Sequence, residues 1–297
     1  MAFSNSNKVS LSGKTVIVTG ANTGIGYETA LECAKRGGRV ILACRDETKG
    51  LKAIEIIQKL TANKNVILKR LDLASLNSVR EFAQDILKNE RRLDILINNA
   101  GAIMLGNQKT IDGFQLEMQV NYLAPVLITM LLLDLLKKSA PSRIVNVSSK
   151  AAKYAKKFTP EQINSYKSHV NAYSNSKLGN ILFTQVLAEK LKDFNVSVFS
   201  LHPGAIYTDI AIQHLNPCIQ SCGKCFSNIF LKTPVEGSQT TLYVALEQGI
   251  EHLTGRHFEE CKVVKSYSTA KDPKQAKQIW DSTLKLLSYD ENETIRI

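Results

Sequence analysis

Short runs of valine, isoleucine and leucine recur along the chain, separated by longer stretches that mix apolar and polar residues. Runs of this kind predict buried strands, because β-branched and aliphatic side chains pack well in a sheet that is covered on both faces. The predicted strands are 15–19, 39–43, 66–71, 94–97, 143–147 and 196–201.

Between the strands, apolar residues return every three or four positions, which is typical of amphipathic helices. The helical stretches lie near 26–36, 46–61, 76–89, 113–138 and 171–192. Regular alternation of strand and helix implies right-handed crossovers and a parallel sheet with helices on both faces. The chain has no internal repeat and no low-complexity linker, so we predict a single doubly wound α/β domain over residues 1–297.

The helical stretch 171–192 begins with YSNSK, which places Tyr173 and Lys177 four positions apart. Residues at this spacing share one face of a helix, so the phenol and the ammonium can reach the same point. A positive charge nearby favours the phenolate and lowers the phenol's pKa from its usual value of about 10. Taken alone, the pair also fits an ordinary solvated helix.

The first predicted strand leads into TGANTGIG (19–26), in which Gly20, Gly24 and Gly26 come just before a helix. Glycines let the backbone approach a pyrophosphate, and the helix N-terminus offers free N–H groups and a positive dipole. A tight turn alone can also require glycine. The position between a strand and a helix, however, favours a dinucleotide site in a Rossmann domain.

Composition and charge exclude several classes of protein. The chain is 44% hydrophobic and 22% charged, as soluble domains usually are. No apolar run approaches the ~18 residues that span a bilayer, and residues 1–14 lack the apolar core of a signal peptide, so we expect a cytoplasmic protein. The net charge of +11 arises from scattered basic residues without a nucleic-acid motif, so we expect no nucleic-acid partner.

In the cytoplasm the six cysteines should be reduced thiols. Cys218, Cys222 and Cys225 form a cluster, but no fourth ligand stands at suitable spacing, although His214 is the nearest candidate. We therefore expect no metal, and we interpret the cluster as small hydrophobic side chains in a loop.

Several motifs stand in an order that resembles the short-chain dehydrogenases/reductases. They are TGANTGIG, LDL (71–73), NNAG (98–101), the Asn121 of VNYL, VNVSS (145–149), YSNSK and HPG (202–204). The agreement covers about residues 10–260, and the motifs are jointly very specific. The phrases ANTGIG, ILACRD, NILFTQVLAEKL and KTPVEGSQTTLY further resemble the retinol dehydrogenase-like branch. The resemblance implies hydride transfer between a nicotinamide cofactor and an alcohol or carbonyl substrate.

The resemblance also implies catalytic roles. Tyr173 would exchange a proton with the substrate oxygen, while Lys177 would lower the phenol's pKa and hold the nicotinamide ribose. Ser149 would polarise the substrate oxygen. Ser148 is the alternative, because strand alternation should allow only one of the two serines to face the site.

Asn121 is the fourth residue with an implied catalytic role, since its carbonyl would hold a water of a proton relay in this family. Pro125 follows four residues later and has no N–H to donate to that carbonyl. The sequence therefore predicts a free acceptor at Asn121. A simple proline kink is a compatible interpretation.

The end of the second predicted strand bears on the choice of cofactor. NAD-preferring sites place an acid there, but LACRD has Cys44 at that position and Arg45 beside it. A guanidinium can bind a 2′-phosphate with two hydrogen bonds, so we predict NADP(H). Asp46 would instead cap the next helix.

The resemblance implies that the cofactor is contacted by the glycine-rich turn and by several later motifs. The implied binding residues are Gly20, Asn22, Thr23, Gly24, Ile25, Gly26, Arg45, Asp72, Leu73, Asn99, Ala100, Gly101, Tyr173, Lys177, Pro203, Gly204 and Thr208.

Three segments bear on the substrate and on partners. Residues 207–233 should form a lid whose apolar side chains suit an apolar alcohol or carbonyl substrate, although they fit packing against the sheet equally well. Residues 150–169 carry five lysines and one glutamate, which fits a solvated face or a peripheral contact with anionic lipid. The apolar stripe of 273–288 predicts a C-terminal helix that packs on its own domain rather than on a partner.

A second class of function is a catalytically idle NADP(H)-binding scaffold that acts through a protein partner. Such a scaffold would show a broken Ser–Tyr–Lys set, and here Ser149, Tyr173 and Lys177 are all present. The chain gives no indication of its oligomeric state.

Overall fold

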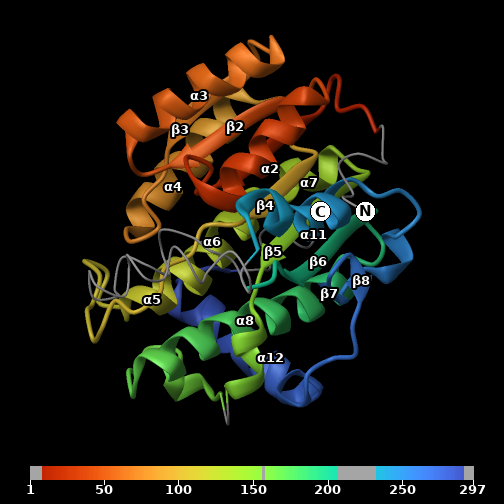
Figure 1. Cartoon of the computed structure of the whole chain (residues 1–297). Coiled ribbons are helices and arrows are strands. Elements are labelled where there is room, and N and C mark those ends of the chain that lie inside the picture. Colours follow the sequence, from red (N-terminus) through yellow and green to blue (C-terminus); the bar gives the residue numbers. More distant parts are fainter. Residues whose placement is uncertain (1–8, 156–157, 206–231, 291–297) are drawn as a thin grey trace.

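An eight-stranded sheet with the order β3-β2-β1-β4-β5-β6-β7-β8 runs through the protein, as a computed structural model shows (Figure 1). The structure describes residues 9–155, 158–205 and 232–290. Neighbouring strands are parallel except β7 and β8, which are antiparallel. The strands are β1 (Thr15–Thr19), β2 (Arg39–Cys44), β3 (Val66–Arg70), β4 (Ile95–Asn98), β5 (Ser142–Val147), β6 (Val196–His202), β7 (His257–Glu259) and β8 (Lys262–Val263).

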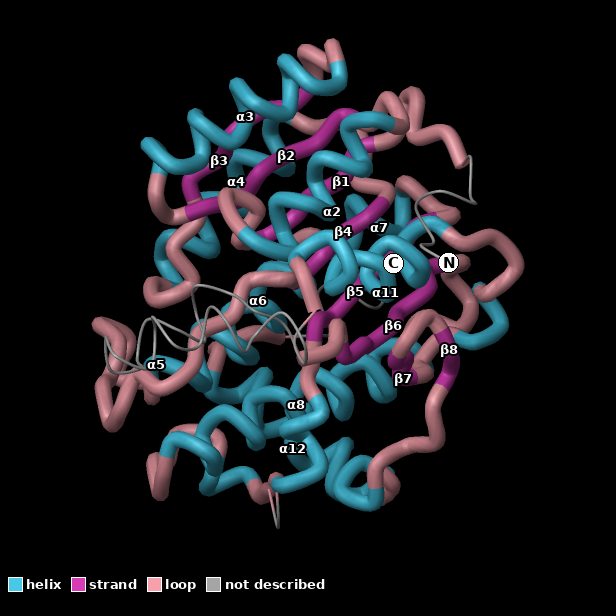
Figure 2. The backbone as a smooth tube through the Cα atoms, in the orientation of Figure 1, coloured by secondary structure: helices cyan, strands magenta, loops and turns pink. Residues whose placement is uncertain are grey.

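Helices cover both faces of this sheet (Figure 2). They are α2 (Gly24–Lys35), α3 (Glu47–Thr61), α4 (Leu76–Asn89), α5 (Leu116–Met118), α6 (Ala124–Leu131), α7 (Leu133–Lys138), α8 (His169–Lys190), α11 (Pro234–Leu246) and α12 (Pro273–Leu286). The shorter helical turns are η1 (Gln119–Leu123), η2 (Lys150–Tyr154), η3 (Pro160–Gln162), η4 (Glu251–Leu253) and η5 (Ser268–Ala270).

Side chains alternate between the two faces along each strand, and this alternation divides the core in two. Val16 and Val18 of β1 pack with α2, α3 and α11, whereas Ile17 packs with α4, α6, α8 and α12. The predicted doubly wound sheet with helices on both faces is therefore confirmed. The predicted strands, the C-terminal helix and most other predicted helices end within two residues of the observed bounds.

The single helix predicted over 113–138 is wrong, because the structure divides this stretch into α5, η1, α6 and α7. The turn η1 is a π-helix, in which the N–H of Ala124 bonds to the carbonyl of Gln119. Pro125 follows directly and offers no N–H to the carbonyl of Asn121, so the regular α-helical ladder is interrupted here. Strands β7 and β8 and helix α11 were not predicted.

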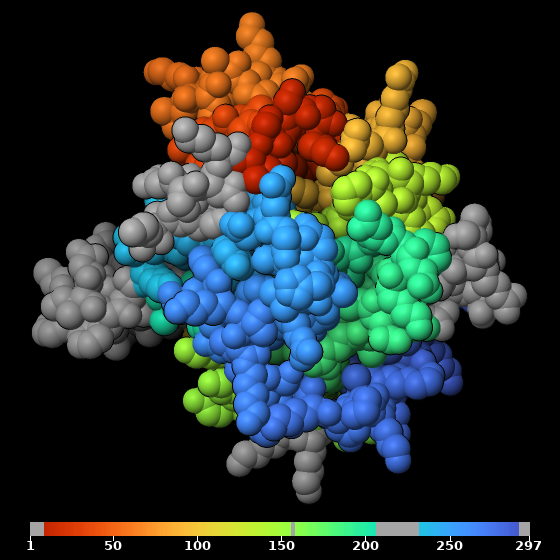
Figure 3. All heavy atoms as spheres, turned by 90° about the vertical axis from the view of Figure 1, so that its right-hand side faces the viewer, coloured from red at the N-terminus to blue at the C-terminus, as the bar shows by residue number. Residues whose placement is uncertain are grey.

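The C-terminal helix α12 packs against α8, and both helices cover the same face of the sheet. Trp280 stacks on Phe183 with ring centroids 5.3 Å apart, and Thr283 hydrogen bonds to the buried hydroxyl of Tyr122 at 2.9 Å. Figure 3 views the side of the molecule that is at the right in Figure 1, and the C-terminal residues, in blue, fill its middle and lower part. These contacts favour the interpretation that α12 belongs to its own domain.

Some predictions fall on residues outside the described part of the chain. These are the lid apart from residues 232–233, Thr208, the cluster of Cys218, Cys222 and Cys225, and two of the lysines in 150–169. Within the described ranges, none of the helices is both long and apolar enough to cross a bilayer.

Gly179 lies on α8 against the ring of Tyr122, and this contact generates a prediction about stability. A Cβ at Gly179 would come within 2.8 Å of the ring, which is fully buried and held by Thr283. We expect Gly179→Ala to lower the free energy of unfolding by about 1–2 kcal/mol, because overpacking costs ~1–3 kcal/mol whereas alanine gains at most ~1 kcal/mol in helix propensity.

Urea unfolding of both variants measures this effect, with Gly50→Ala as the matched control. Gly50 is also in the interior of a helix, but its added Cβ would come within 2.5 Å of a terminal methyl of the partly exposed Leu68, a flexible side chain that can shift. The control should be as stable as the wild type or slightly more stable. If the two variants were equally stable, the Tyr122 ring would not be the constraint at Gly179.

Candidate active site

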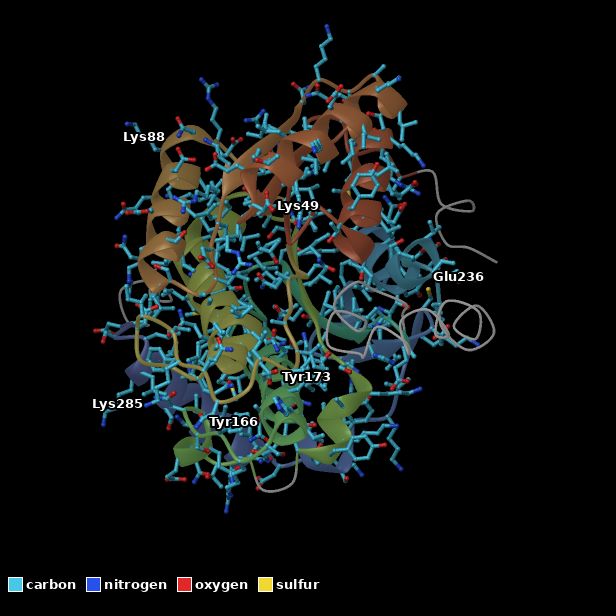
Figure 4. All side chains as sticks on the ribbon, turned by 60° about the vertical axis from the view of Figure 1, so that its left-hand side comes forward. Lys49, Lys88, Tyr166, Tyr173, Glu236 and Lys285 are labelled. Carbon is cyan, nitrogen blue, oxygen red and sulfur yellow. The ribbon has the colours of Figure 1, made fainter. Side chains whose placement is uncertain are left out.

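Two adjoining cavities of about 500 and 400 Å³ lie at the carboxyl ends of the parallel strands. This is the side of an open α/β sheet where ligands bind, near the point at which the strand order reverses between β1 and β4. Figure 4 labels Lys49 on the α3 side and Tyr173 on the α8 side of this region. The two cavities share the lining residues Gly20, Asn22, Ala100, Gly101, Ala102 and Ile103.

The glycine-rich turn lines the larger cavity with backbone. Gly20 and Gly24 have φ values of +65° and +58°, which side chains rarely adopt. A Cβ on Gly20 would lie 3.0 Å from Ala100, and a Cβ on Gly26 would overlap the carbonyl of Gly20. The turn therefore fits a group that needs close approach to backbone N–H groups, such as a pyrophosphate. The predicted residues Asn22, Thr23 and Ile25 line the same cavity.

The loop after β4 is tied to this turn by hydrogen bonds. Thr19 accepts the N–H groups of Asn99 and Ala100 on its hydroxyl, both at 3.0 Å, and its carbonyl accepts Asn99 Nδ2 at 2.9 Å. Asn99, Ala100 and Gly101 consequently line the larger cavity, together with Pro203 and Gly204 from the end of β6.

The smaller cavity is lined by Cys44 and Arg45, the residues predicted to choose the cofactor, and by the predicted binding residues Asp72 and Leu73. Cys44 is 2% exposed, and burial raises the pKa of its thiol to about 11, so this position carries no charge at neutral pH. Asp46 caps α3 by accepting the N–H of Lys49 at 2.9 Å, which confirms its predicted role as a cap.

Tyr173 and Lys177 line one end of the larger cavity, and Ser149 lies next to Tyr173 without being among the residues that line either cavity. The hydroxyl of Ser149 is near enough to the phenol of Tyr173 to lower its pKa. The Nζ of Lys177 lies 5.7 Å from the centre of the Tyr173 ring and donates to the carbonyl of Val147 at 3.0 Å. The shared helical face predicted from the YSNSK spacing thus brings Tyr173 and Lys177 together.

The pKa of Tyr173 differs from the sequence expectation. Burial raises it above the usual phenol value, the nearby hydroxyl of Ser149 lowers it, and Glu117 makes a smaller contribution that raises it. Burial also lowers the pKa of Lys177 to about 8. Desolvation disfavours both charged forms and here outweighs the attraction between them that the spacing alone suggested.

Ser148 lines the larger cavity and Ser149 does not, although the sequence favoured Ser149 as the one serine of the pair that faces the site. The hydroxyl of Ser148 donates to the carbonyl of Lys177 at 2.6 Å. The strand β5 ends at Val147, so its alternation no longer applies to the two serines. Ser148 holds the backbone of α8, while Ser149 meets the phenol.

Asn121 is buried and bonded on every side. Its side-chain amide accepts the N–H of Ala102 at 2.7 Å and donates to the carbonyl of Ala102 at 2.8 Å and to Ser176 at 3.2 Å. Its own carbonyl accepts Asn180 Nδ2 at 3.0 Å, so the prediction of a free acceptor is wrong. The missing N–H of Pro125 is replaced by a side chain.

Sequence reasoning missed Asn180 and Glu117. Asn180 stands three positions after Lys177 on α8, so the shared helical face was a signal that could have identified it. Glu117 gave only a weak signal, as a single acid within the apolar stretch around Leu116 and Met118.

Comparisons with known proteins agree with this geometry. Residues 14–217 match the short chain dehydrogenase family. Retinol dehydrogenase 11 of Mus musculus is 45% identical over 282 residues, which cover 95% of this chain and 88% of that protein. Retinol dehydrogenase 12 of Homo sapiens is 44% identical over 280 residues, covering 94% and 88%.

Solved structures resemble most of the chain. An uncharacterised protein from Mycobacterium paratuberculosis is 29% identical, with a TM-score of 0.77 and coverage of 98% of this chain and 99% of that one. A short chain dehydrogenase from Escherichia coli CFT073 complexed with NADPH is 27% identical, with a TM-score of 0.66 and coverage of 85% and 98%. The chain therefore belongs to the short-chain dehydrogenase/reductase family, in its retinol dehydrogenase-like branch.

Proposed function

We propose that the protein is an NADP(H)-dependent oxidoreductase that transfers a hydride between the nicotinamide and an apolar alcohol or carbonyl substrate. The observation that carries the proposal is the meeting of Ser149, Tyr173 and Lys177 beside a cavity lined by the glycine-rich turn. An idle scaffold would have no use for this arrangement. A cytoplasmic location stays a prediction.

The bound nicotinamide would supply or accept the hydride, and the residues of the chain would manage the proton. Tyr173 would give its hydroxyl proton to a substrate oxygen or take one from it. Ser149, whose hydroxyl lies near the phenol, would donate to the same oxygen and hold it in place. Lys177 would be protonated at neutral pH, since its pKa is about 8, and would stabilise negative charge on the phenol oxygen.

Two observations support NADP(H) over NAD(H). Cys44 is neutral at the position where NAD-preferring sites place an acid, and Arg45 lines the same cavity beside it. A related short chain dehydrogenase from Escherichia coli CFT073 was solved with NADPH.

An apolar substrate is supported by the wall of the larger cavity and by the relatives. Ala102, Ile103, Met104 and Val147 present apolar side chains there. The relatives in the comparisons include retinol dehydrogenases 11 and 12, so a retinoid or another long apolar alcohol or aldehyde is the substrate class to test first.

Tyr173→Phe should bind NADPH nearly as well as the wild type and lose turnover by two or more orders of magnitude, because the proton donor is gone. Steady-state reduction of retinal and of medium-chain aldehydes measures the rate, and fluorescence titration measures the binding. Tyr166→Phe is the matched control, since Tyr166 lies just before α8 and contacts His169. Full activity in Tyr173→Phe would refute the proposed acid.

Lys177→Met should weaken both the binding of NADPH and the rate, because the lysine is proposed to hold the ribose and to stabilise charge on Tyr173. The same titration and rate measurements separate the two roles. A variant that lost rate alone, with NADPH binding intact, would exclude the ribose contact.

Arg45→Ala should weaken NADPH binding by roughly ten- to a hundredfold and leave NADH binding almost unchanged. A hydrogen bond to a charged group is worth about 1.5–3 kcal/mol, and ~1.4 kcal/mol is a factor of ten. Cys44→Asp should go further, because it repels a phosphate and offers an acceptor to the ribose hydroxyls of NADH.

Both cofactors are titrated at one fixed salt concentration, because phosphate binding is screened by salt. Arg91→Ala is the control. Arg91 is exposed and lines neither cavity, so this substitution also removes one positive charge, but at a distance from the proposed cofactor site. Equal weakening of NADPH and NADH by Arg45→Ala would contradict the NADP assignment.

A further inference from the structure

Lys49 of α3 borders the smaller cavity, although neither the sequence motifs nor the proposed reaction assigned it a role. It stands four residues after Arg45, which lines the same cavity, and its side chain is 65% exposed. Figure 4 shows Lys49 on the α3 side of the site. A lysine ammonium offers three donors and no acceptor, so it suits an anionic ligand. The cavity therefore has a second cation that packing does not require.

The charged side chains that line the smaller cavity are two cations and two anions. They are Arg45, Asp46, Lys49 and Asp72. Without Lys49 the two acids would outnumber the arginine, and a lining with an excess of negative charge repels a phosphate. Lys49 therefore decides whether the charge of this lining is negative or balanced.

Asp46 is the acid beside Arg45, and its carboxylate is directed toward Lys49. Its Oδ1 accepts the backbone N–H of Lys49 at 2.9 Å, and its Oδ2 lies 3.6 Å from the Lys49 ammonium. The bond from the Lys49 N–H lowers the pKa of Asp46, so Asp46 is ionised at neutral pH. The structure thus gives this negative charge Lys49 as its ionic partner.

Both cations keep donors for a ligand. Among the residues that the structure describes, Arg45 has no hydrogen-bond or ion-pair partner, so its guanidinium is free to bind. The contact of Lys49 with Asp46 is, at 3.6 Å, longer than a good hydrogen bond, so the three N–H groups of the ammonium are not consumed by it. A phosphate in the smaller cavity can therefore meet donors from both side chains.

The neighbouring charges on α3 are directed elsewhere. Glu47 lies 3.8 Å from Arg70 at the end of β3 and lines neither cavity. Lys52, one turn after Lys49, is exposed and also lines neither cavity. All of α3 is described, and Lys49 is the residue of this helix that borders the smaller cavity.

We propose that Lys49 is a second specificity-determining residue for the cofactor, whose ammonium donates directly to the 2′-phosphate of NADP(H) beside the guanidinium of Arg45. This inference rests on the proposed function, from which it takes the preference for NADP(H). Arginine presents a planar fork to two phosphate oxygens, and lysine adds a compact point charge to a further oxygen. The pair also offsets Asp46, which would otherwise oppose a phosphate at this position.

Lys49→Met tests the contact, because methionine keeps the apolar stem and the helix propensity and loses the charge. Calorimetric titration should show binding of NADPH and of 2′,5′-ADP weakened by about three- to tenfold, and binding of NADH and 5′-AMP unchanged. The loss is smaller than that for Arg45→Ala, since an exposed point charge contributes less than a bidentate arginine. Lys52→Met is the matched control: it removes the same charge from the same helix and should bind all four ligands like the wild type.

The Asp46→Asn background separates a direct contact from mere neutralisation of Asp46. Asparagine still caps α3 but carries no charge. In this background Lys49→Met should weaken the binding of 2′,5′-ADP by about the same factor as in the wild type. If the effect disappeared there, Lys49 would act only on Asp46, and the direct contact would be overturned. The factor should also shrink as salt is raised, because the charges are exposed.

The two nucleotide fragments distinguish failure of this proposal from failure of the proposed function. 5′-AMP and 2′,5′-ADP differ only in the 2′-phosphate, and their binding requires no turnover. Equal affinity of the wild type for both would contradict the NADP(H) preference itself, and the role of Lys49 with it. A wild type that prefers 2′,5′-ADP, with that preference fully retained in Lys49→Met or lost equally in Lys52→Met, would overturn the role of Lys49 and leave the proposed function standing.

Discussion

Asn121 lies buried between the loop after β4 and helix α8, and its amide bonds both backbone groups of Ala102 as well as Ser176. The loop carries the wall of the cavities, and α8 carries Tyr173, so this one side chain sets their relative position. Its carbonyl, released from the helix by Pro125, is held by Asn180 of the same helix α8. Asn121 lies in the π-helical turn η1, and these tertiary contacts stabilise that turn. A regular α-helix would point the Asn121 side chain in another direction.

Because the site is shielded from water, the pKa values of its groups depend strongly on neighbouring charges. In a buried site each ionised group interacts with its neighbours more strongly than it would in water. Tyr173 is consequently subject to opposed effects: burial favours the protonated phenol, whereas the nearby hydroxyl of Ser149 favours the phenolate. This balance sets the pKa of Tyr173. The YSNSK motif contains only the tyrosine and the lysine, so it does not predict the contributions of burial and of Ser149.

Local patterns predicted much of the fold and of the site, because strands, amphipathic helices and the YSNSK face depend on neighbouring residues. The errors arose where distant residues decide. The carbonyl of Asn121 is held by Asn180, 59 residues later in the chain, and the pKa of Tyr173 is raised mainly by burial among residues from distant parts of the chain. The short edge strands β7 and β8 have too few residues to show a period, and β8 pairs only through its neighbour.

The two adjoining cavities differ in how strongly their polar residues are buried. At the Tyr173 end, Asn121, Ser148 and Lys177 are all at most 3% exposed, and a change in any of them leaves buried polar partners unsatisfied. At the other end Cys44 is buried but neutral, and Arg45 is exposed, with its charge in solvent. Substitutions of Arg45 therefore disturb few internal contacts, and cofactor preference can change while the proton chemistry stays fixed. For the same reason, salt should weaken the interaction at Arg45 far more than the interactions around Tyr173, because exposed charges are screened and buried ones are not.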